Sequence, residues 1–294
     1  MNKRCVDAVM IGALLFVAQL ALPRYVTAQD ATGAYTWENS TELSFVSTGG
    51  NASSSTLGLR SALTATGEPN AFKIEVGGIR AETTFRTLTA TGTATDFTVN
   101  ETTNSELTAE NHFARGRYDR AFAGAFAGAF AFSGAGWDRN TFAGIQNRYA
   151  FVAGFGKAFA DSETGRFKVD IGLTYTLQKD VNPAPSVDEG FGGVRFGLDA
   201  MRQLSTSAEF SSTLIVDENL EETDDLRADW INSLSVSLSE RLSFKTSLQL
   251  LYDKQPSLLS VGLLDAGGGP TGTDVLTPGD KVDNILTLAL VIRI

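Results

Sequence analysis

The sequence has a single cysteine, Cys5, and a single histidine, His112. With one cysteine the chain can form neither an internal disulfide nor a site built from several thiolates. One histidine without neighbouring cysteines is too little for a zinc site, and no serine and histidine share a motif that indicates a membrane phospholipase. We therefore expect no enzymatic activity, no cofactor and no bound metal.

Positive charge and long apolar runs are scarce as well. The chain has 24 Lys and Arg against 34 Asp and Glu, which gives a formal net charge of −10 at pH 7. An acidic chain is a poor partner for nucleic acid, so we expect none. After residue 28 no stretch reaches 18 consecutive apolar residues, so the sequence predicts no membrane helix there.

The first residues follow the plan of a secretory signal peptide. Lys3 and Arg4 precede an apolar run, Ala8–Leu22, and the segment Val26–Ala28 supplies the small residues of a cleavage site. We predict a signal peptide over residues 1–28, which includes Cys5, and a single domain over residues 29–294. A protein with such a segment is exported.

What the sequence does have is strict alternation, most clearly in Arg166–Gln178. The apolar residues Phe167, Val169, Ile171, Leu173, Tyr175 and Leu177 occupy every second position, and polar residues or glycine fill the gaps. Alternate side chains of a strand point to opposite faces, so this strand has one apolar and one polar face. Its length suits a strand that crosses a bilayer at a tilt, with the apolar face in lipid and the polar face in a lumen.

Twelve such segments follow one another, which is an even number, as bacterial barrels require. The sequence predicts an all-β fold, an antiparallel up-and-down transmembrane β-barrel of 12 strands in the bacterial outer membrane. A soluble exported β-sandwich is the alternative if the polar faces are the exposed ones. The predicted strands are Tyr35–Ser47, Ser54–Thr66, Ala71–Glu82, Thr98–Ala114, Arg120–Ser133, Phe142–Phe159, Phe167–Gln178, Gly193–Leu204, Thr206–Asp217, Asp225–Leu238, Arg241–Asp253 and Val282–Ile294.

Several details of the barrel can be predicted further. Short links, such as Arg115–Asp119, alternate with long ones, such as Arg86–Phe97 and Lys254–Lys281, as expected for periplasmic turns and outer loops. Strand one should pair with the last strand, with Glu38 near Arg293 at the seam. The apolar piece of the longest link, Leu258–Leu264, should extend the neighbouring strands or fold over the mouth.

Two side-chain directions follow from the same alternation. On the fifth predicted strand we expect Phe122, Phe126, Phe130 and Phe132 to face outward and the intervening alanines to face inward. On the fourth predicted strand His112 shares its parity with two glutamates, Glu106 and Glu110, so we expect it to face the lumen as a satisfied polar side chain.

Charged residues on the predicted inner face mix both signs. They could line a selective pore, or they could be paired with one another and fill a closed barrel. The candidate lumen-lining residues are Arg60, Lys168, Asp170, Arg195, Asp199, Glu209, Arg227, Asp229, Lys245 and Asp253.

The stretches Glu42–Leu59, Arg148–Gly156, Arg166–Gln178, Asn232–Lys245 and Asp283–Ile294 resemble the salt-induced outer-membrane protein family. The resemblance implies an outer-membrane β-barrel with a role in the envelope or in osmotic stress and without catalytic residues. Its partners would be outer-membrane lipid and the barrel-insertion machinery, although the chain ends on Ile294 where such barrels end on an aromatic residue. The alternative function is a passive channel for small polar or ionic solutes.

Overall fold

The computed structural model describes residues 35–48, 52–93, 97–162, 164–183 and 190–293, so the predicted signal peptide and Ile294 lie outside the described residues. Its strands are β1 Thr36–Thr48, β2 Ala52–Gly67, β3 Asn70–Gly92, β4 Phe97–Ala121, β5 Ala129–Asn140, β6 Ile145–Ser162, β7 Gly165–Asp180, β8 Gly190–Gln203, β9 Ala208–Asn219, β10 Leu226–Ser237, β11 Leu242–Asp253, β12 Leu258–Leu264, β13 Pro270–Pro278 and β14 Val282–Arg293. The described part of the chain contains no apolar helix of membrane-spanning length.

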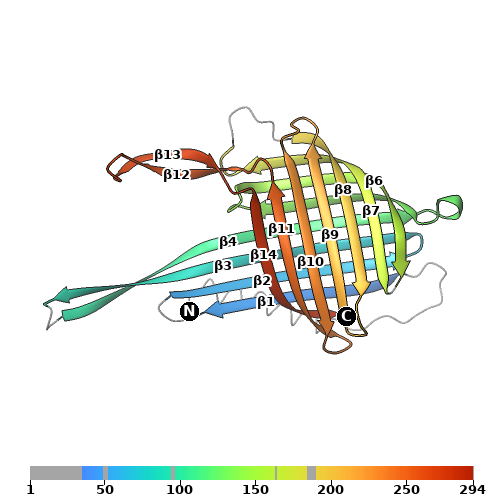
Figure 1. Cartoon of the computed structure of the whole chain (residues 1–294), viewed down its shortest axis with the longest axis horizontal. Coiled ribbons are helices and arrows are strands. Elements are labelled where there is room, and N and C mark those ends of the chain that lie inside the picture. The colour runs from blue at the N-terminus through green and yellow to red at the C-terminus, as the bar shows by residue number, and fades with distance from the viewer. Residues whose placement is uncertain (1–34, 49–51, 94–96, 163, 184–189, 294) are drawn as a thin grey trace. The chain divides into compact units, whose positions relative to one another are not determined.

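Twelve of these strands form a closed antiparallel barrel (Figure 1) in the order β1-β14-β11-β10-β9-β8-β7-β6-β5-β4-β3-β2. The predicted fold class and strand number are confirmed. From β1 to β11 each strand pairs with the next along the chain, β11 pairs with β14, and β1 closes the barrel against β14 with Leu43 opposite Leu290. At this seam Ser40 lies directly opposite Arg293, so Glu38, which we predicted near Arg293, is two residues before the paired position on the same face of β1.

The hairpin β3–β4 is much longer than its neighbours (Figure 1), with 23 and 25 residues. The link predicted at Arg86–Phe97 is wrong, because the two strands stay paired as far as Gly92 and Phe97. The link predicted at Arg115–Asp119 is wrong too, because these residues belong to β4. Threonines such as Thr87 and Thr102 pair across the hairpin. Threonine favours strands, so a polar segment that reads as a loop continues as a ribbon.

The fifth strand begins later than predicted. We expected it over Arg120–Ser133, whereas β5 runs from Ala129 to Asn140. The intervening residues form a short 3₁₀ turn at Gly124–Phe126. Gly124 and Gly128 adopt positive φ angles of 68° and 83°, which other residues rarely adopt. These glycines interrupt a segment whose alternation of alanine and phenylalanine otherwise favours one continuous strand.

The longest link contains a hairpin of its own. β12 pairs with β13, Val261 opposite Val275, as a two-stranded sheet separate from the barrel. The apolar piece Leu258–Leu264 therefore takes a partner strand from the same link and does not extend β11 or β14. The turn of this hairpin includes Gly268 at a φ of 82°.

The two ends of the barrel differ. At the terminal end, where β1 begins and β14 ends, the links comprise residues 68–69, 122–128, 163–164, 204–207 and 238–241. At the opposite end, which we call the loop end, the described or partly described links include 141–144, 181–189, 220–225 and 254–281. The predicted alternation of short and long links holds only in part: 181–189 and 254–281 are long, but the loop-end link 141–144 is as short as the terminal-end links 204–207 and 238–241, and the terminal-end link 122–128 is longer.

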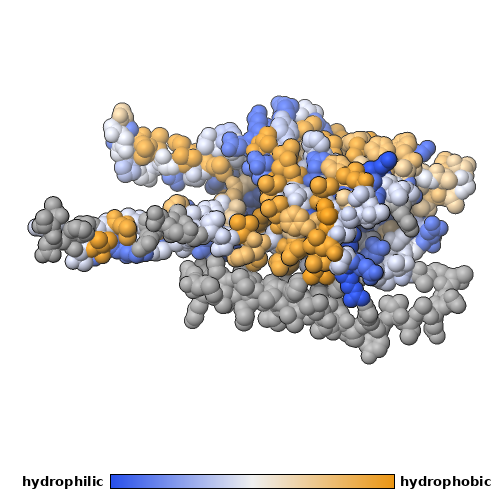
Figure 2. Space-filling model, turned by 60° about the horizontal axis from the view of Figure 1, so that its bottom comes forward, coloured by the Kyte–Doolittle hydropathy of each residue, from blue (hydrophilic) through white to orange (hydrophobic). Residues whose placement is uncertain are grey.

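The outer wall of the barrel is apolar. On β7 the outward side chains of Ile171, Leu173 and Tyr175 are 64%, 69% and 51% exposed, whereas the intervening Asp170 and Thr176 are 9% and 5% exposed. Figure 2 shows hydrophobic side chains gathered on the barrel wall next to more hydrophilic areas. In a closed barrel the less exposed side chains are those that point inward, so the polar face of β7 is the lumen face.

Candidate functional site in the barrel lumen

Side chains from opposite walls meet inside the barrel. In the closed strand order β4 and β10 are six places apart in either direction, so they face each other across the lumen. Arg115 on β4 nevertheless reaches Asp229 on β10, with 3.9 Å between Nη1 and Oδ2. Arg115 also donates to Asp138 on β5 at 3.0 Å, and Gln249 on β11 donates to Asp229 at 2.8 Å. These contacts span the full width of the lumen.

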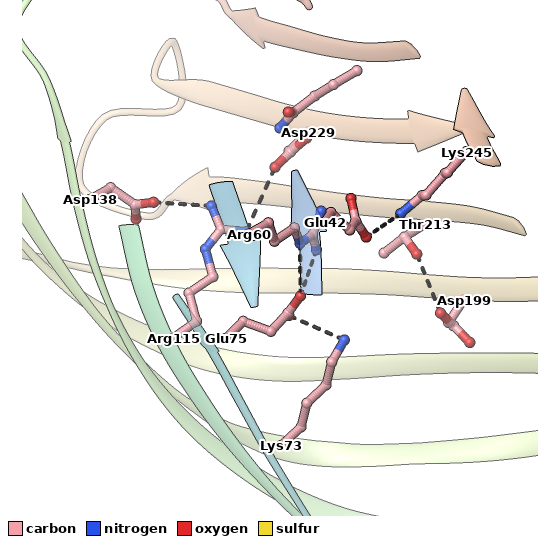
Figure 3. A network of polar contacts seen from close by, with 11 residues as sticks. Glu42, Arg60, Lys73, Glu75, Arg115, Asp138, Asp199, Thr213, Asp229 and Lys245 are labelled. Atoms are coloured by element: carbon pink, nitrogen blue, oxygen red, sulfur yellow. Dashed lines mark hydrogen bonds and ion pairs between the residues drawn. The ribbon is translucent and has the colours of Figure 1, made fainter. Parts of the chain in front are cut away.

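Further ion pairs lie beside this bridge (Figure 3). Arg60 on β2 donates through Nε to Glu75 on β3 at 3.2 Å, and Lys73 contacts the other oxygen of Glu75 at 3.1 Å. Lys245 on β11 donates to Glu42 on β1 at 2.6 Å, reaching past the intervening β14. Positive and negative groups thus neutralise one another, which is how charges are retained in a space with little water.

Aromatic side chains fill the lumen toward the terminal end. Phe130 and Phe132 on β5 are only 8% and 4% exposed. The guanidinium of Arg117 lies 4.1 Å from the centre of the Phe132 ring and also donates to Asp170 on β7 at 2.8 Å. A stacked and paired arginine of this kind combines a cation–π contact with a charge-assisted hydrogen bond.

The predicted direction of the β5 side chains is therefore wrong for Phe130 and Phe132. They face inward, and Ala131 and Ser133 face outward. The reason lies on β6 and β7, where a Cβ atom on Gly156 would overlap the Phe130 ring and one on Gly172 would lie 3.1 Å from the Phe132 ring. The two glycines leave the space that the rings occupy. Asp138, which shares the parity of both phenylalanines, is the sequence signal for the inner face.

Toward the loop end two arginines converge on one amide. Arg148 on β6 and Arg227 on β10 donate to Oε1 of Gln178 on β7, at 2.7 and 3.0 Å. Arg227 also contacts Asp225 at 3.2 Å. Since β7 and β10 are three strands apart, these bonds also cross the interior.

Most of the remaining candidate residues also have a side-chain or backbone partner on the inner face or at its rims. Lys168 contacts Asp161 at 2.8 Å, and Arg195 donates to Asp217 at 2.7 Å. Asp199 accepts from Arg166 and, at 3.3 Å, from Thr213. Glu209 lies opposite Gln203 and Ser235 in the sheet, and Asp253 accepts a hydrogen bond from the Gln255 backbone at 3.0 Å.

Loops at the loop end are joined by an exposed ion pair. Lys254, after β11, donates to Asp224, before β10, at 2.6 Å. The hydrogen bond lowers the pKa of Asp224 and raises the pKa of Lys254, because each charge favours the ionised form of the other. The pair is therefore charged on both sides over the whole neutral range.

His112 does not face the lumen as predicted. Arg115 and Arg117 point inward from β4, so His112, Ala114 and Gly116 point outward. Nε2 of His112 lies 3.3 Å from Oε1 of Glu110 on the same outer face. We predicted a lumen-facing His112 from its polarity, but polarity does not identify the face here, because His112 lies where β4 leaves the apolar part of the wall. Among the described residues no three His, Cys, Asp or Glu side chains gather as a metal site would.

A closed antiparallel barrel with an apolar outer wall and a charged, internally paired lumen defines a membrane-spanning β-barrel protein. The model of the family described as "Protein of unknown function, DUF481" matches residues 41–258. The chain belongs to this family.

Solved structures of other barrels are similar over most of the chain. An outer membrane channel from Pseudomonas putida F1 is 10% identical, with 92% of this chain and 99% of that chain covered and a TM-score of 0.41. An anion-selective porin from Comamonas acidovorans is 11% identical, with 89% and 100% covered and a TM-score of 0.35. The translocator domain of autotransporter NalP from Neisseria meningitidis is 13% identical, with 99% and 96% covered and a TM-score of 0.34. No curated protein matches the sequence.

Proposed function

We propose that this protein is an integral barrel of the bacterial outer membrane, with its terminal end toward the periplasm and its loop end outside. Short turns on the periplasmic side and long loops outside are the rule for such barrels. Aromatic pairs support a membrane boundary at the terminal end: ring centres are 4.8 Å apart in Phe72 and Tyr118 and 5.8 Å apart in Phe159 and Phe167. Residues 1–28 would direct export, and the barrel-insertion machinery would place the barrel in lipid.

Within the membrane the barrel acts as a sealed, non-catalytic component of the envelope. The observation that carries this proposal is the contact of Arg115 with Asp229 across the full width of the lumen. The low exposure of Phe132, at 4%, and of Ser243, at 2%, supports it, because residues lining a wide aqueous pore would be accessible to water. Among the described residues Arg115, Arg195 and Lys245 are each engaged by lumen carboxylates, as expected for charges with a structural role.

Conductance in a planar bilayer tests this function. The refolded wild-type protein should show heat-modifiable mobility, which reports a folded barrel, and little or no single-channel current. The double variant Arg115→Ala/Asp229→Ala removes the bridge across the lumen and should conduct. The control double variant Arg195→Ala/Asp217→Ala removes an ion pair that lies along the wall between adjacent strands, and it should conduct less. A stable current through the wild-type protein would contradict the sealed barrel.

A passive channel for small ions is the second candidate. What favours it is the partial exposure of inner charges of both signs: the side chains of Arg166 and Asp199 are each 36% exposed. Water that reaches such groups could carry ions past them. In the same bilayer experiment a channel would give wild-type current that depends on the salt gradient.

A role in osmotic adaptation draws its support from the family resemblance of stretches such as Arg166–Gln178. A deletion strain should then grow more slowly than its parent after a shift to high salt and equally well without the shift. Equal growth of the two strains in both media would contradict the role in osmotic adaptation but not the structural role in the envelope.

A further inference from the structure

A row of basic residues lies on the outer face of the barrel at its loop end. Outward positions are those that share the parity of exposed apolar residues, such as Val76 on β3 and Leu177 on β7, at 47% and 40% exposed. By this parity and by the strand registers, the outward side chains at the loop end of four strands are Arg80 on β3, His112 on β4, Arg139 on β5 and Lys179 on β7.

The register brings these residues side by side. His112 lies directly opposite Arg139 between β4 and β5, and on its other side opposite Gly78, two residues before Arg80. Lys179 lies opposite Asn147 of β6, the strand that follows β5 in the barrel. Neighbouring strands are about 4.8 Å apart, so four strand intervals give the row a length of about 19 Å.

The row stands at the edge of the apolar wall. Arg80 is eight residues beyond Phe72, which marks the aromatic terminal end of β3. Eight residues at about 3.3 Å, tilted by about 40°, rise about 20 Å, close to the ~25 Å height of the apolar band of such barrels. Directly below the row Trp137 lies opposite Tyr149, and the Trp137 indole donates to Asn147 at 3.1 Å. Tryptophan and tyrosine favour the level of lipid headgroups.

The charge of the row is positive in a chain whose net charge is −10. Two carboxylates adjoin it: Glu110 accepts contacts from Arg80 and His112, each at 3.3 Å, and Glu82 shares the outward parity of Arg80 two residues further along β3. Arg139 uses one N–H group on the backbone oxygen of Gln146 at 3.1 Å. A guanidinium has five N–H donors, so both arginines keep further donors for an anion at the headgroup level.

We propose that Arg80, His112, Arg139 and Lys179 form a binding site for the phosphate groups of a phosphorylated glycolipid in the outer leaflet. Guanidinium groups match phosphate oxygens in geometry as well as in charge. A row of about 19 Å extends beyond one phosphate, which favours a lipid with two phosphate groups over one with a single phosphate. The site rests on the proposed outer-membrane location, because that location puts the loop end in the outer leaflet.

Titration of the folded protein in neutral detergent tests the site, with tryptophan fluorescence as the readout because Trp137 adjoins the row. The probes are a bisphosphorylated glycolipid, its dephosphorylated form and inorganic phosphate. Wild-type protein should bind the bisphosphorylated form most tightly. Arg80→Gln/Arg139→Gln should weaken this binding about tenfold or more, because each lost charge-assisted hydrogen bond accounts for about that factor. The single variant Lys179→Gln provides a second reading if the double variant does not fold.

Lys157→Gln is the matched control, because Lys157 is also exposed on the outer wall but lies at the terminal end of β6. Its affinity should equal that of the wild type. Equal affinity of wild-type protein and all row variants would overturn the site, and binding of inorganic phosphate as tight as that of the glycolipid would show that no lipid is required. Loss of heat-modifiable mobility in the wild type would instead count against the barrel's membrane role, so the two failures can be told apart.

Discussion

β7 and β5 are both barrel strands with strict alternation, yet only β7 has the orientation that its sequence suggests. On β7 large apolar residues alternate with charged and hydroxyl residues, and Leu173 faces outward at 69% exposure. On β5 phenylalanine alternates with alanine, and the larger residue faces inward, as Phe132 does at 4% exposure. Alternation defines two faces, but it identifies the lipid face only when the other face is polar enough to be excluded from lipid.

Space on the neighbouring strands decides the orientation of β5. Gly156 on β6 and Gly172 on β7 leave room in the lumen that Phe130 and Phe132 fill, with Arg117 stacked on Phe132. Alanine on the outer face costs little, because a barrel wall in lipid tolerates small residues as well as large ones. The aromatic residues therefore face the side on which they gain contacts.

The largest loss of stability should come from removing a lumen-facing aromatic ring of β5. Phe132→Ala removes a buried ring and should destabilise the barrel by about 3–5 kcal/mol, the usual range for a buried phenylalanine. Phe151→Ala is the matched control on β6, since Phe151 is 49% exposed on the lipid side, and its cost should be much smaller. Urea unfolding from lipid vesicles measures both, and equal losses would mean that Phe132 does not face inward.

Much of the fold could be predicted from the sequence, because alternation over twelve or more residues is typical of membrane-barrel strands and longer than most strands of soluble proteins. The closed order of twelve strands and the pairing of β1 with β14 follow from that pattern. The length of β3 and β4 could not be predicted, since the tip of the hairpin is mostly polar and has only a few exposed apolar residues, such as Leu88 and Val99 at 56% and 53%. His112 was misassigned for a related reason: beyond the apolar band, polarity no longer separates inside from outside.

The partners in the ion pairs could not be predicted from the sequence either. Each candidate charge could be assigned to a face, but the partner of Arg115 lies on the opposite wall, 114 positions later in the chain, at Asp229. Which strands face each other depends on the number of strands and on the registers together. A shift in either would give each arginine a different carboxylate.

The second prediction tests the β7 side of the comparison. Leu173→Arg places a charge in the lipid-facing wall and should cost about 2–4 kcal/mol if the position is near the middle of the bilayer. Thr174→Arg, one residue on, places the same charge in a lumen that already holds paired charges and should cost much less. Vesicle unfolding of the two variants gives the answer, and similar losses would contradict a lipid-facing Leu173.

The smallest effect should come from filling the space that orients β5. A Cβ on Gly156 would overlap the Phe130 ring and approach the Asp170 Cβ to 2.8 Å, so Gly156→Val must displace a ring or a strand. Overpacking of this kind costs about 1–3 kcal/mol. Gly116→Val is the control, because a Cβ on Gly116 meets nothing within 4 Å and valine suits a strand. If Gly156→Val is as stable as Gly116→Val, the ring of Phe130 does not depend on that glycine, and another feature must turn β5 inward. If it is destabilised and Gly156→Val/Phe130→Ala regains stability, the two residues share one space, and the orientation of β5 is determined by its neighbour.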